Sequence, residues 1–272
     1  MWTRRELKDR AKPAFRKNYW KCVLVALILM ILVDGAANAS GIGGSSRAVG
    51  SGLDLSPDVL LEDDTDVYEY EDEYGDDLEI IGEMDDSGSI LENISPAGAL
   101  IAALGFGFIL VFLAIMLVIQ IFVCNPIEVG GCGFFMKNTE ENAGPGELFS
   151  AFQSGYYGKI VMTLFLRNLY TVLWTLLLII PGIIKSYEYR MIPYILAENP
   201  EISREEAFRL SKEMMAGEKW NAFVLDLSFI GWDFLSGITW GLVGIFWTNP
   251  YRYATNAELY LALKGRKRNF EM

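Results

Sequence analysis

Seven charged side chains lie in or beside long apolar segments of this sequence, and these side chains are the ones best placed to do chemistry. They are Arg167, Lys185, Glu188, Arg190, Asp226, Asp233 and Arg252. A lone charge at the centre of a bilayer costs about 2.5–3.5 kcal/mol, so each charge is expected to have a partner. Asp226 and Asp233 are seven residues apart, which predicts that both lie on one face of a single helix. Arg167, Lys185 or Arg190 could face them.

These charges have two interpretations. As a binding site they would form a polar pocket for an ion, a proton or a lipid headgroup. The candidate ligand-binding residues are then Arg167, Lys185, Glu188, Arg190, Asp226 and Asp233. As structural elements they would be ion pairs that fix the helix register, or charges that reach toward a membrane interface. A proton shared by the two aspartates is disfavoured, because seven helical residues separate them by about 10 Å unless the helix breaks near Gly231.

No motif in the chain matches a known type of catalytic or metal site. The sequence has no His, which removes the commonest general base and the commonest metal ligand. Cys22, Cys124 and Cys132 lack the paired spacing of metal ligands and are expected to pack as small apolar residues. Nucleophile motifs and phosphate-binding glycine loops are also missing. We therefore expect no enzymatic activity, no catalytic residue, no metal and no cofactor.

The charge of the chain is strongly segregated. The 272 residues are 52% hydrophobic with a net charge of −12, and no Lys or Arg lies between Arg47 and Lys137. Seventeen acids fall within residues 54–92, and the rest of the chain holds 18 acids against 23 bases. Basic loops stay cytoplasmic whereas long acidic loops translocate readily, which predicts an integral membrane protein with residues 54–92 outside. Nucleic acid is disfavoured as a partner, because phosphate contacts need clustered bases.

Residues 1–39 are predicted to form a basic N-terminal helix and the first transmembrane span. Leu7, Ala11, Ala14 and Phe15 share one face of an amphipathic helix, and an apolar run from Cys22 to Val33 follows. A cleavable signal peptide is the alternative, but the long amphipathic head and a span of about 20 residues favour an uncleaved helix. The N-terminus is cytoplasmic in either case.

Residues 40–95 are predicted to form an acidic extracellular loop. Self-repulsion of its carboxylates prevents a packed core, so we expect it to be solvated and disordered. The alternative is that it docks a basic protein partner or captures cations weakly.

Residues 96–272 are predicted to form a membrane bundle. Residues 97–123 are an apolar span, and the Gly-rich stretch from residue 124 to about residue 159 resembles a cytoplasmic linker. Residues 160–180 are a third span that ends in a helix break at 179–182. Residues 183–199 are then a short fourth span or a re-entrant half-helix, because the six bases that follow the break belong on the cytoplasmic side.

A cytoplasmic amphipathic helix is predicted at residues 203–216. Ser203 and Glu206 form a capping box, and Gly217 is a natural stop. A turn near Gly237 would give two crossings, at roughly residues 220–236 and 238–263, and would return the basic C-terminal tail to the cytoplasm. The chain is therefore expected to be an all-α, polytopic transmembrane bundle of about six spans with both termini cytoplasmic. Four spans, with residues 183–221 outside, is the alternative.

A weak internal repeat agrees with the six-span scheme. Proline follows an apolar helix at Asn125-Pro126, Ile192-Pro193 and Asn249-Pro250. Three helical hairpins of related design would explain the repeat, although chance matches are also expected in so apolar a chain.

Segments of the chain resemble a known bacterial membrane family. They are WTRRELK (2–8), NPIEVG (125–130), LW (173–174) with IPGIIKSY (180–187), MIPY (191–194), AFRLSK (207–212) with MAGEKW (215–220), and SFIGW (228–232). With these segments the chain resembles the integral-membrane family known as domain of unknown function 975. It is more distantly similar to the membrane domain of some glycerophosphodiester phosphodiesterases. The resemblance implies a location in the bacterial plasma membrane, leaves the function open and supplies no catalytic residue.

Two functions are compatible with these observations. The first is a non-enzymatic membrane module that binds or moves a small ligand, ion or lipid within the helical bundle, since Gly- and Pro-interrupted helices are typical of transporter sites. The second is an accessory or scaffold protein that docks a protein partner through the acidic loop or the cytoplasmic helix. The lipid bilayer surrounds the protein in both.

Overall fold

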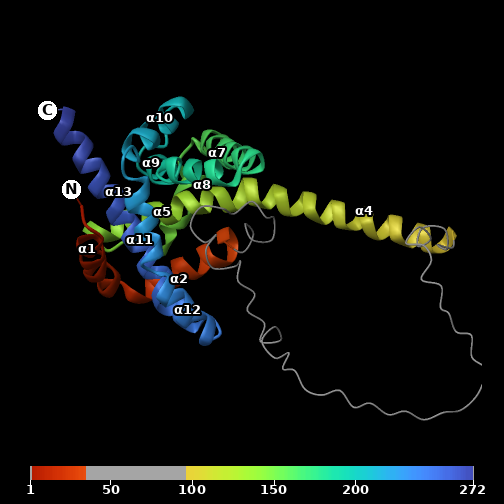
Figure 1. Cartoon of the computed structure of the whole chain (residues 1–272), viewed down its shortest axis with the longest axis horizontal. Coiled ribbons are helices and arrows are strands. Elements are labelled where there is room, and N and C mark those ends of the chain that lie inside the picture. Colours follow the sequence, from red (N-terminus) through yellow and green to blue (C-terminus); the bar gives the residue numbers. More distant parts are fainter. Residues whose placement is uncertain (1, 35–95, 272) are drawn as a thin grey trace, which may run out of the picture. The chain divides into compact units, whose positions relative to one another are not determined.

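The computed structural model describes residues 2–34 and 96–271, and all regular structure in these ranges is helical, as predicted (Figure 1). The predicted acidic loop, residues 40–95, lies outside the described residues. Residues 96–112 belong to one unit and the other described residues to a second.

The first segments in chain order are α1 (Arg4–Lys17), α2 (Tyr19–Leu29), η1 (Met30–Asp34), α4 (Pro96–Ile119), η3 (Gln120–Cys124), α5 (Asn125–Glu140), η4 (Pro145–Phe149) and α6 (Ser150–Gln153). They are followed by α7 (Tyr157–Leu177), α8 (Ile179–Glu188), α9 (Ile192–Glu198), α10 (Arg204–Met214), α11 (Lys219–Leu227), α12 (Ile230–Ile238), η5 (Gly244–Thr248) and α13 (Asn249–Glu271).

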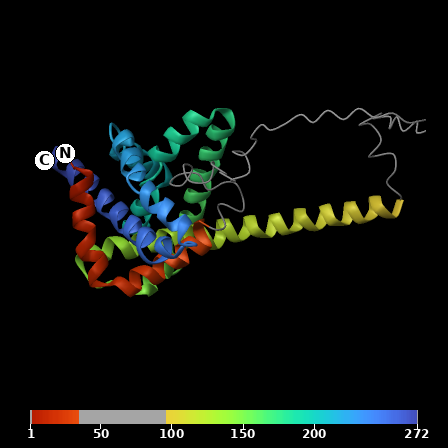
Figure 2. The same ribbon diagram turned by 60° about the horizontal axis from the view of Figure 1, so that its bottom comes forward.

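Helix α1 confirms the predicted amphipathic face. Its buried residues are Leu7, Ala11, Ala14 and Phe15. The helix packs along α13, where the Tyr251 hydroxyl donates a hydrogen bond to the Lys8 carbonyl oxygen over 3.0 Å (Figures 1 and 2). The basic N-terminal helix and the C-terminal helix therefore lie side by side.

Helix α5 lies at the centre of the fold, and the prediction that this stretch is a linker is wrong. Its glycines signal close packing. A Cβ at Gly130 would lie 2.1 Å from the Leu148 carbonyl oxygen of η4, and one at Gly131 would lie 2.6 Å from the Leu29 side chain of α2. At Gly130 only glycine allows the η4 backbone to approach this closely, whereas at Gly131 a Cβ would require the Leu29 side chain to move.

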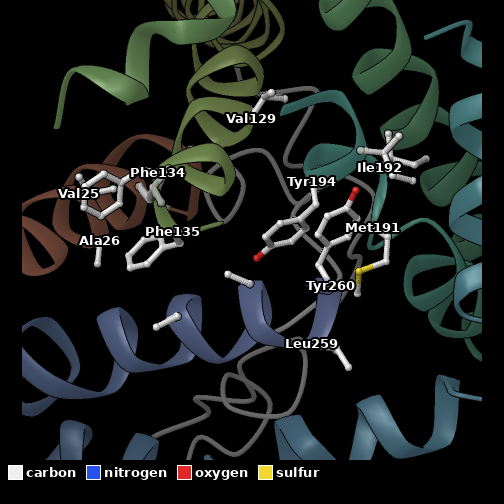
Figure 3. Packing of buried hydrophobic residues seen from close by; sticks show 14 of the residues in the cluster. Val25, Ala26, Val129, Phe134, Phe135, Met191, Ile192, Tyr194, Leu259 and Tyr260 are labelled. Carbon is white, nitrogen blue, oxygen red and sulfur yellow. The ribbon is translucent and has the colours of Figure 1, made fainter. Parts of the chain in front are cut away.

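The core around α5 is formed by side chains from segments far apart in the sequence (Figure 3). Phe134 and Phe135 of α5 lie near Val25 and Ala26 of α2 in the figure. Tyr194 of α9 stacks on Tyr260 of α13, with 5.4 Å between ring centroids. Helices α2, α5, α9 and α13 therefore share one apolar core.

Helices α7 and α8 form a tight hairpin. The chain reverses at Leu178, whose backbone is extended, so the predicted break occurs one residue before the 179–182 segment. A Cβ at Gly182 would lie 2.3 Å from the Thr175 hydroxyl oxygen, which shows how closely the two helices approach. Pro181 lies in the first turn of α8. Backbone N–H groups in a first turn have no acceptor within the helix, so proline, which lacks this group, is tolerated there. The side chains at the tip are apolar and exposed: Leu176, Leu177, Leu178, Ile179 and Ile180.

The stretch expected to hold Asp226 and Asp233 on one helix is broken, so that prediction is wrong. Helix α11 ends at Leu227, the chain turns through Ser228 and Phe229, and α12 begins at Ile230. The Ser228 hydroxyl donates to the Leu225 carbonyl oxygen over 2.5 Å, which competes with continuation of the helix.

The turn predicted near Gly237 is found at residues 239–241. Trp240 adopts a positive φ of 53° and Gly241 one of 84°. The Trp240 side chain is 96% exposed. A reversal therefore separates α12 from η5 and α13.

Two of the predicted repeats, Asn125-Pro126 and Asn249-Pro250, share one local structure. Each proline follows a π-helical segment, η3 or η5, in which the asparagine N–H bonds the carbonyl five residues earlier. Proline has no N–H to donate to the carbonyl four residues earlier, and its ring clashes with that carbonyl. The wider π-helical turn relieves the clash. The freed carbonyls are not left unpaired. Phe122 O accepts from the Tyr157 hydroxyl at 2.6 Å, and Phe246 O accepts from the Tyr19 hydroxyl at 3.1 Å.

Helix α10 confirms the predicted helix at residues 203–216. The Ser203 hydroxyl accepts from the Glu206 N–H over 3.2 Å, and Gly217 has a φ of 75°. Ala207 and Ser211 are buried, while Leu210 and Met214 pack at the edge of the core. The apolar face of α10 thus packs on the helical bundle.

Within residues 2–34 and 96–271, two helical stretches are long and apolar enough to cross a membrane, Ala103–Glu140 and Tyr157–Leu177. A shorter apolar helix covers Tyr19–Val33. Judged on length and composition alone, these stretches give modest support for membrane association.

Candidate functional site

A cluster of charged side chains lies where α8 meets α11. We call this the α8–α11 seam and define it by Lys185, Tyr187, Glu188, Arg190, Lys219 and Asp226. Tyr187 and Glu188 lie in the last turn of α8, and Arg190 lies in the turn before α9. Lys219 and Asp226 lie at the two ends of α11. The seam therefore joins two helical stretches that are each interrupted, α8–α9 and α11–α12.

Arg190 and Asp226 form a buried, two-pronged ion pair. The guanidinium donates to both carboxylate oxygens, at 2.7 and 2.8 Å, and the two side chains are 7% and 12% exposed. Asp226 also accepts from the Tyr187 hydroxyl at 2.9 Å, and Arg190 also donates to the Asn256 side-chain oxygen of α13 at 2.8 Å. Such a geometry is both strong and directional. The pair ties α8, α11 and α13 together in one register.

Glu188 forms the second centre of the seam and is surrounded by lysines. Its carboxylate is 4% exposed and accepts from Lys219 at 2.8 Å and from Lys185 at 3.1 and 3.2 Å. The Lys212 ammonium of α10 lies 3.4 Å away. Ser211 holds the backbone here, because its hydroxyl donates to the Glu188 carbonyl at 2.7 Å and accepts from the Met191 N–H at 3.3 Å.

The charges around Glu188 do not balance. One carboxylate faces three ammonium groups, which leaves a local charge of about +2 at neutral pH. The lysines differ in exposure, at 22% for Lys185, 34% for Lys219 and 59% for Lys212. The Lys185 ammonium also lies 5.6 Å from the ring centroid of Trp174 and 5.9 Å from that of Tyr189, within range of cation–π attraction. The cluster is positive, partly open to solvent and flanked by aromatic rings.

The remaining predicted charges lie away from the seam. Arg167 of α7 pairs with Glu128 of α5 through two hydrogen bonds of 2.8 Å and also contacts Asn168. Asp233 of α12 pairs with Arg252 of α13. The structure therefore brings together Lys185, Glu188, Arg190 and Asp226 from the predicted set, and places Arg167 and Asp233 in two other ion pairs.

A second group of cationic side chains lies around Phe229, in the turn between α11 and α12. The Lys8 ammonium lies 4.1 Å from the ring centroid and the Arg252 guanidinium 5.2 Å. Lys8 also donates to the Ser228 carbonyl oxygen at 3.2 Å. Burial is the largest cause that lowers the pKa of Lys8, followed by repulsion from Arg4 and Arg252. These contacts anchor α1 to the turn.

Sequence reasoning missed several partners in these clusters. They are Glu128, Tyr187, Lys212, Lys219 and Asn256. Lys212 and Lys219 flank Gly217 and are among the six bases that the charge pattern places on the cytoplasmic side. The sequence signal that could have found them is Gly217, because α10 ends just before this glycine and α11 begins just after it. A turn there brings the two lysines close together. Within the described ranges, no group of three His, Cys, Asp or Glu residues could hold a metal ion.

Comparison with known proteins gives one finding. The model of a family described only as a protein of unknown function matches residues 99–267. No curated protein and no solved structure matches the chain. The distant likeness to the membrane domain of glycerophosphodiester phosphodiesterases therefore has no support from these comparisons.

Proposed function

Because this chain belongs to the DUF975 family of proteins of unknown function, we propose its function from the α8–α11 seam. The protein is a non-enzymatic, multi-pass protein of the bacterial plasma membrane that binds a small ligand, ion or lipid within its helical bundle. The observation that carries this proposal is the buried Arg190–Asp226 pair, which joins two interrupted helices. Interrupted helices with buried charges are the elements from which membrane proteins build substrate and ion sites.

The exposed apolar surface supports a membrane location. The tip of the α7–α8 hairpin and the turn at Trp240 carry large apolar side chains that no part of the described chain covers. A soluble monomer rarely exposes contiguous apolar surface on this scale. In a bilayer the same side chains contact lipid. We propose three hairpins and six crossings, with the acidic residues 54–92 outside.

The packing of α1 on α13 supports cytoplasmic placement of both termini. Both helices carry basic residues, and they lie side by side. Basic flanks stay on the cytoplasmic side of a membrane. An even number of crossings follows from this placement, as in the six-span scheme.

A cysteine placed at Glu205 is expected to be cytoplasmic. Glu205 lies on α10 with its side chain 80% exposed, so Glu205→Cys leaves the packing intact and the thiol accessible. In intact cells a membrane-impermeant maleimide should leave this cysteine unlabelled, and labelling should appear after permeabilisation. Glu62→Cys in the acidic segment serves as the outside control and should label in intact cells. Labelling of both positions in intact cells would establish the four-span alternative, with residues 183–221 outside.

A bound species is expected to remain on the purified protein. Native mass spectrometry of protein released from mild detergent should show one discrete lipid, ion or small-molecule mass. The Asp226→Asn variant should lose that species because it weakens the ion pair that shapes the seam. Lys137→Gln, which removes an exposed pair with Glu147, should retain it. A protein that emerges bare, or that carries only another polypeptide, would replace this proposal with the scaffold function.

A further inference from the structure

We propose that Lys185, Lys212 and Lys219 form a binding site for a dianionic phosphate group, such as a phosphomonoester carried by a lipid headgroup or by a small soluble molecule. This inference rests on the proposed function, since it names the ligand class that the α8–α11 seam takes. The three lysines come from three segments, the C-terminal half of α8, the last turn of α10 and the start of α11.

The local charge points to a dianion. Glu188 neutralises one of the three lysines and leaves about two positive charges. The neighbouring Asp226 is already paired with Arg190 and does not offset them. A phosphomonoester carries about −1.5 to −2 charges at neutral pH, which matches the excess. A phosphodiester carries one negative charge and would leave the cluster positive.

The geometry also suits a phosphate group. The Lys185 and Lys219 ammonium nitrogens lie 3.2 and 2.8 Å from the same Glu188 oxygen, so they are at most 6.0 Å apart. The Lys185 and Lys212 nitrogens lie 3.1 and 3.4 Å from the other oxygen, so they are at most 6.5 Å apart. One phosphate oxygen, or two neighbouring ones, can accept from ammonium groups at this separation. Each of the three ammonium groups has three N–H donors, and the Glu188 carboxylate can accept only some of these nine hydrogen bonds. The remaining donors are available to a phosphate.

Glu188 organises the lysines. Its carboxylate is almost fully buried and its backbone is held by Ser211, so it provides a fixed point for three flexible side chains. Preorganised lysines lose less side-chain entropy when an anion binds. Lys185 is further held beside Trp174 and Tyr189.

The surface beside the cluster favours a lipid as the carrier of the phosphate. Ile180, Ile183 and Ile184 precede Lys185 on α8, and all three are exposed. Leu173 and Trp174 on α7 are exposed as well. A lipid whose headgroup phosphate contacts the lysines can place its acyl chains along this apolar face of the hairpin.

The test is a lipid titration of the full-length protein in a neutral detergent, read by native mass spectrometry. The probes are phosphatidic acid, phosphatidylglycerol and phosphatidylcholine with identical acyl chains, together with glycerol 3-phosphate. We expect phosphatidic acid to bind most tightly. The triple variant Lys185→Gln, Lys212→Gln, Lys219→Gln should bind phosphatidic acid with an affinity at least about tenfold lower, because charge-assisted hydrogen bonds are lost. The control Lys12→Gln, Lys17→Gln, Lys137→Gln removes the same charge from exposed positions elsewhere and should leave the affinity unchanged.

A single variant guards against a folding defect. Lys212 is the most exposed lysine of the cluster, so Lys212→Gln should fold normally and still weaken the binding of phosphatidic acid several-fold. A purely structural role for the cluster predicts no weakening in Lys212→Gln, and this result would overturn the inference.

The outcomes separate this inference from the proposed function. Glycerol 3-phosphate bound as tightly as phosphatidic acid supports the phosphate site and assigns it to a soluble ligand. Equal affinity for phosphatidic acid and phosphatidylcholine overturns the phosphate site. If the wild-type protein then carries a neutral lipid or a cation that the Asp226→Asn variant loses, the proposed function stands without the phosphate site. A bare protein under all conditions overturns both.

Discussion

Replacing Arg190 by methionine is expected to destabilise the protein by about 3–5 kcal/mol, because the change leaves the Asp226 carboxylate buried without its partner. Arg190 is 7% exposed and donates to both Asp226 oxygens and to Asn256. The loss should appear as a lower melting temperature in detergent and as unfolding at lower denaturant concentration. Arg209→Met removes an exposed arginine of α10 and is the matched control, for which little change is expected.

The double variant Arg190→Met, Asp226→Leu tests whether the unpaired Asp226 carboxylate causes the loss of stability in the single variant. Replacing both members of a buried ion pair by apolar groups is often neutral, so most of the lost stability should return. A double variant as unstable as the single one would show that the pair does not account for the effect. In that case the hydrogen bonds of Tyr187 and Asn256 would carry the stability of the seam.

Replacing Gly130 by alanine is expected to destabilise the protein through packing alone. The new Cβ would lie 2.1 Å from the Leu148 carbonyl oxygen and 2.4 Å from its carbon, and backbone atoms cannot rotate away as a side chain can. Helix α5 and the η4 turn must then separate, at a cost of about 1–3 kcal/mol or more. Thermal unfolding in detergent measures the loss.

Gly133→Ala is the control for this prediction, one turn further along the same helix. Its Cβ would lie 3.6 Å from the Ala197 Cβ, which is an ordinary contact. Alanine is the better helix former by about 1 kcal/mol, so Gly133→Ala should be neutral or slightly stabilising. Equal destabilisation by both changes would show that the close approach of η4 to α5 is not what requires glycine at position 130.

Local signals in the sequence predicted local structure well. The spacing of Leu7, Ala11 and Phe15 identified the buried face of α1. Ser203 and Gly217 marked both ends of α10. These signals succeed because a helix face or a cap depends on residues three or four positions apart, which the sequence places together.

Features that depend on distant segments were predicted poorly. The glycines of α5 resembled those of a loop, although they allow α2 and η4 to pack closely on a central helix. The candidate residues Arg167 and Asp233 were expected beside the others, but each found a partner on a neighbouring helix, Glu128 or Arg252. An apolar chain offers many helix pairings of similar hydrophobic energy, so pattern alone does not select the partner of a given charge.

The turn at Trp240 places a large apolar side chain where glycine would fit the backbone better. A left-handed conformation costs a non-glycine residue about 1–2 kcal/mol, and the adjacent Gly241 shows that the chain uses glycine where φ is positive. The Trp240 indole is 96% exposed, so within the described chain it recovers almost none of that cost by packing. Glycine would therefore adopt this turn at a lower cost. In the membrane location proposed for this protein, the exposed indole would lie at the lipid–water boundary, the environment in which this ring is most favoured.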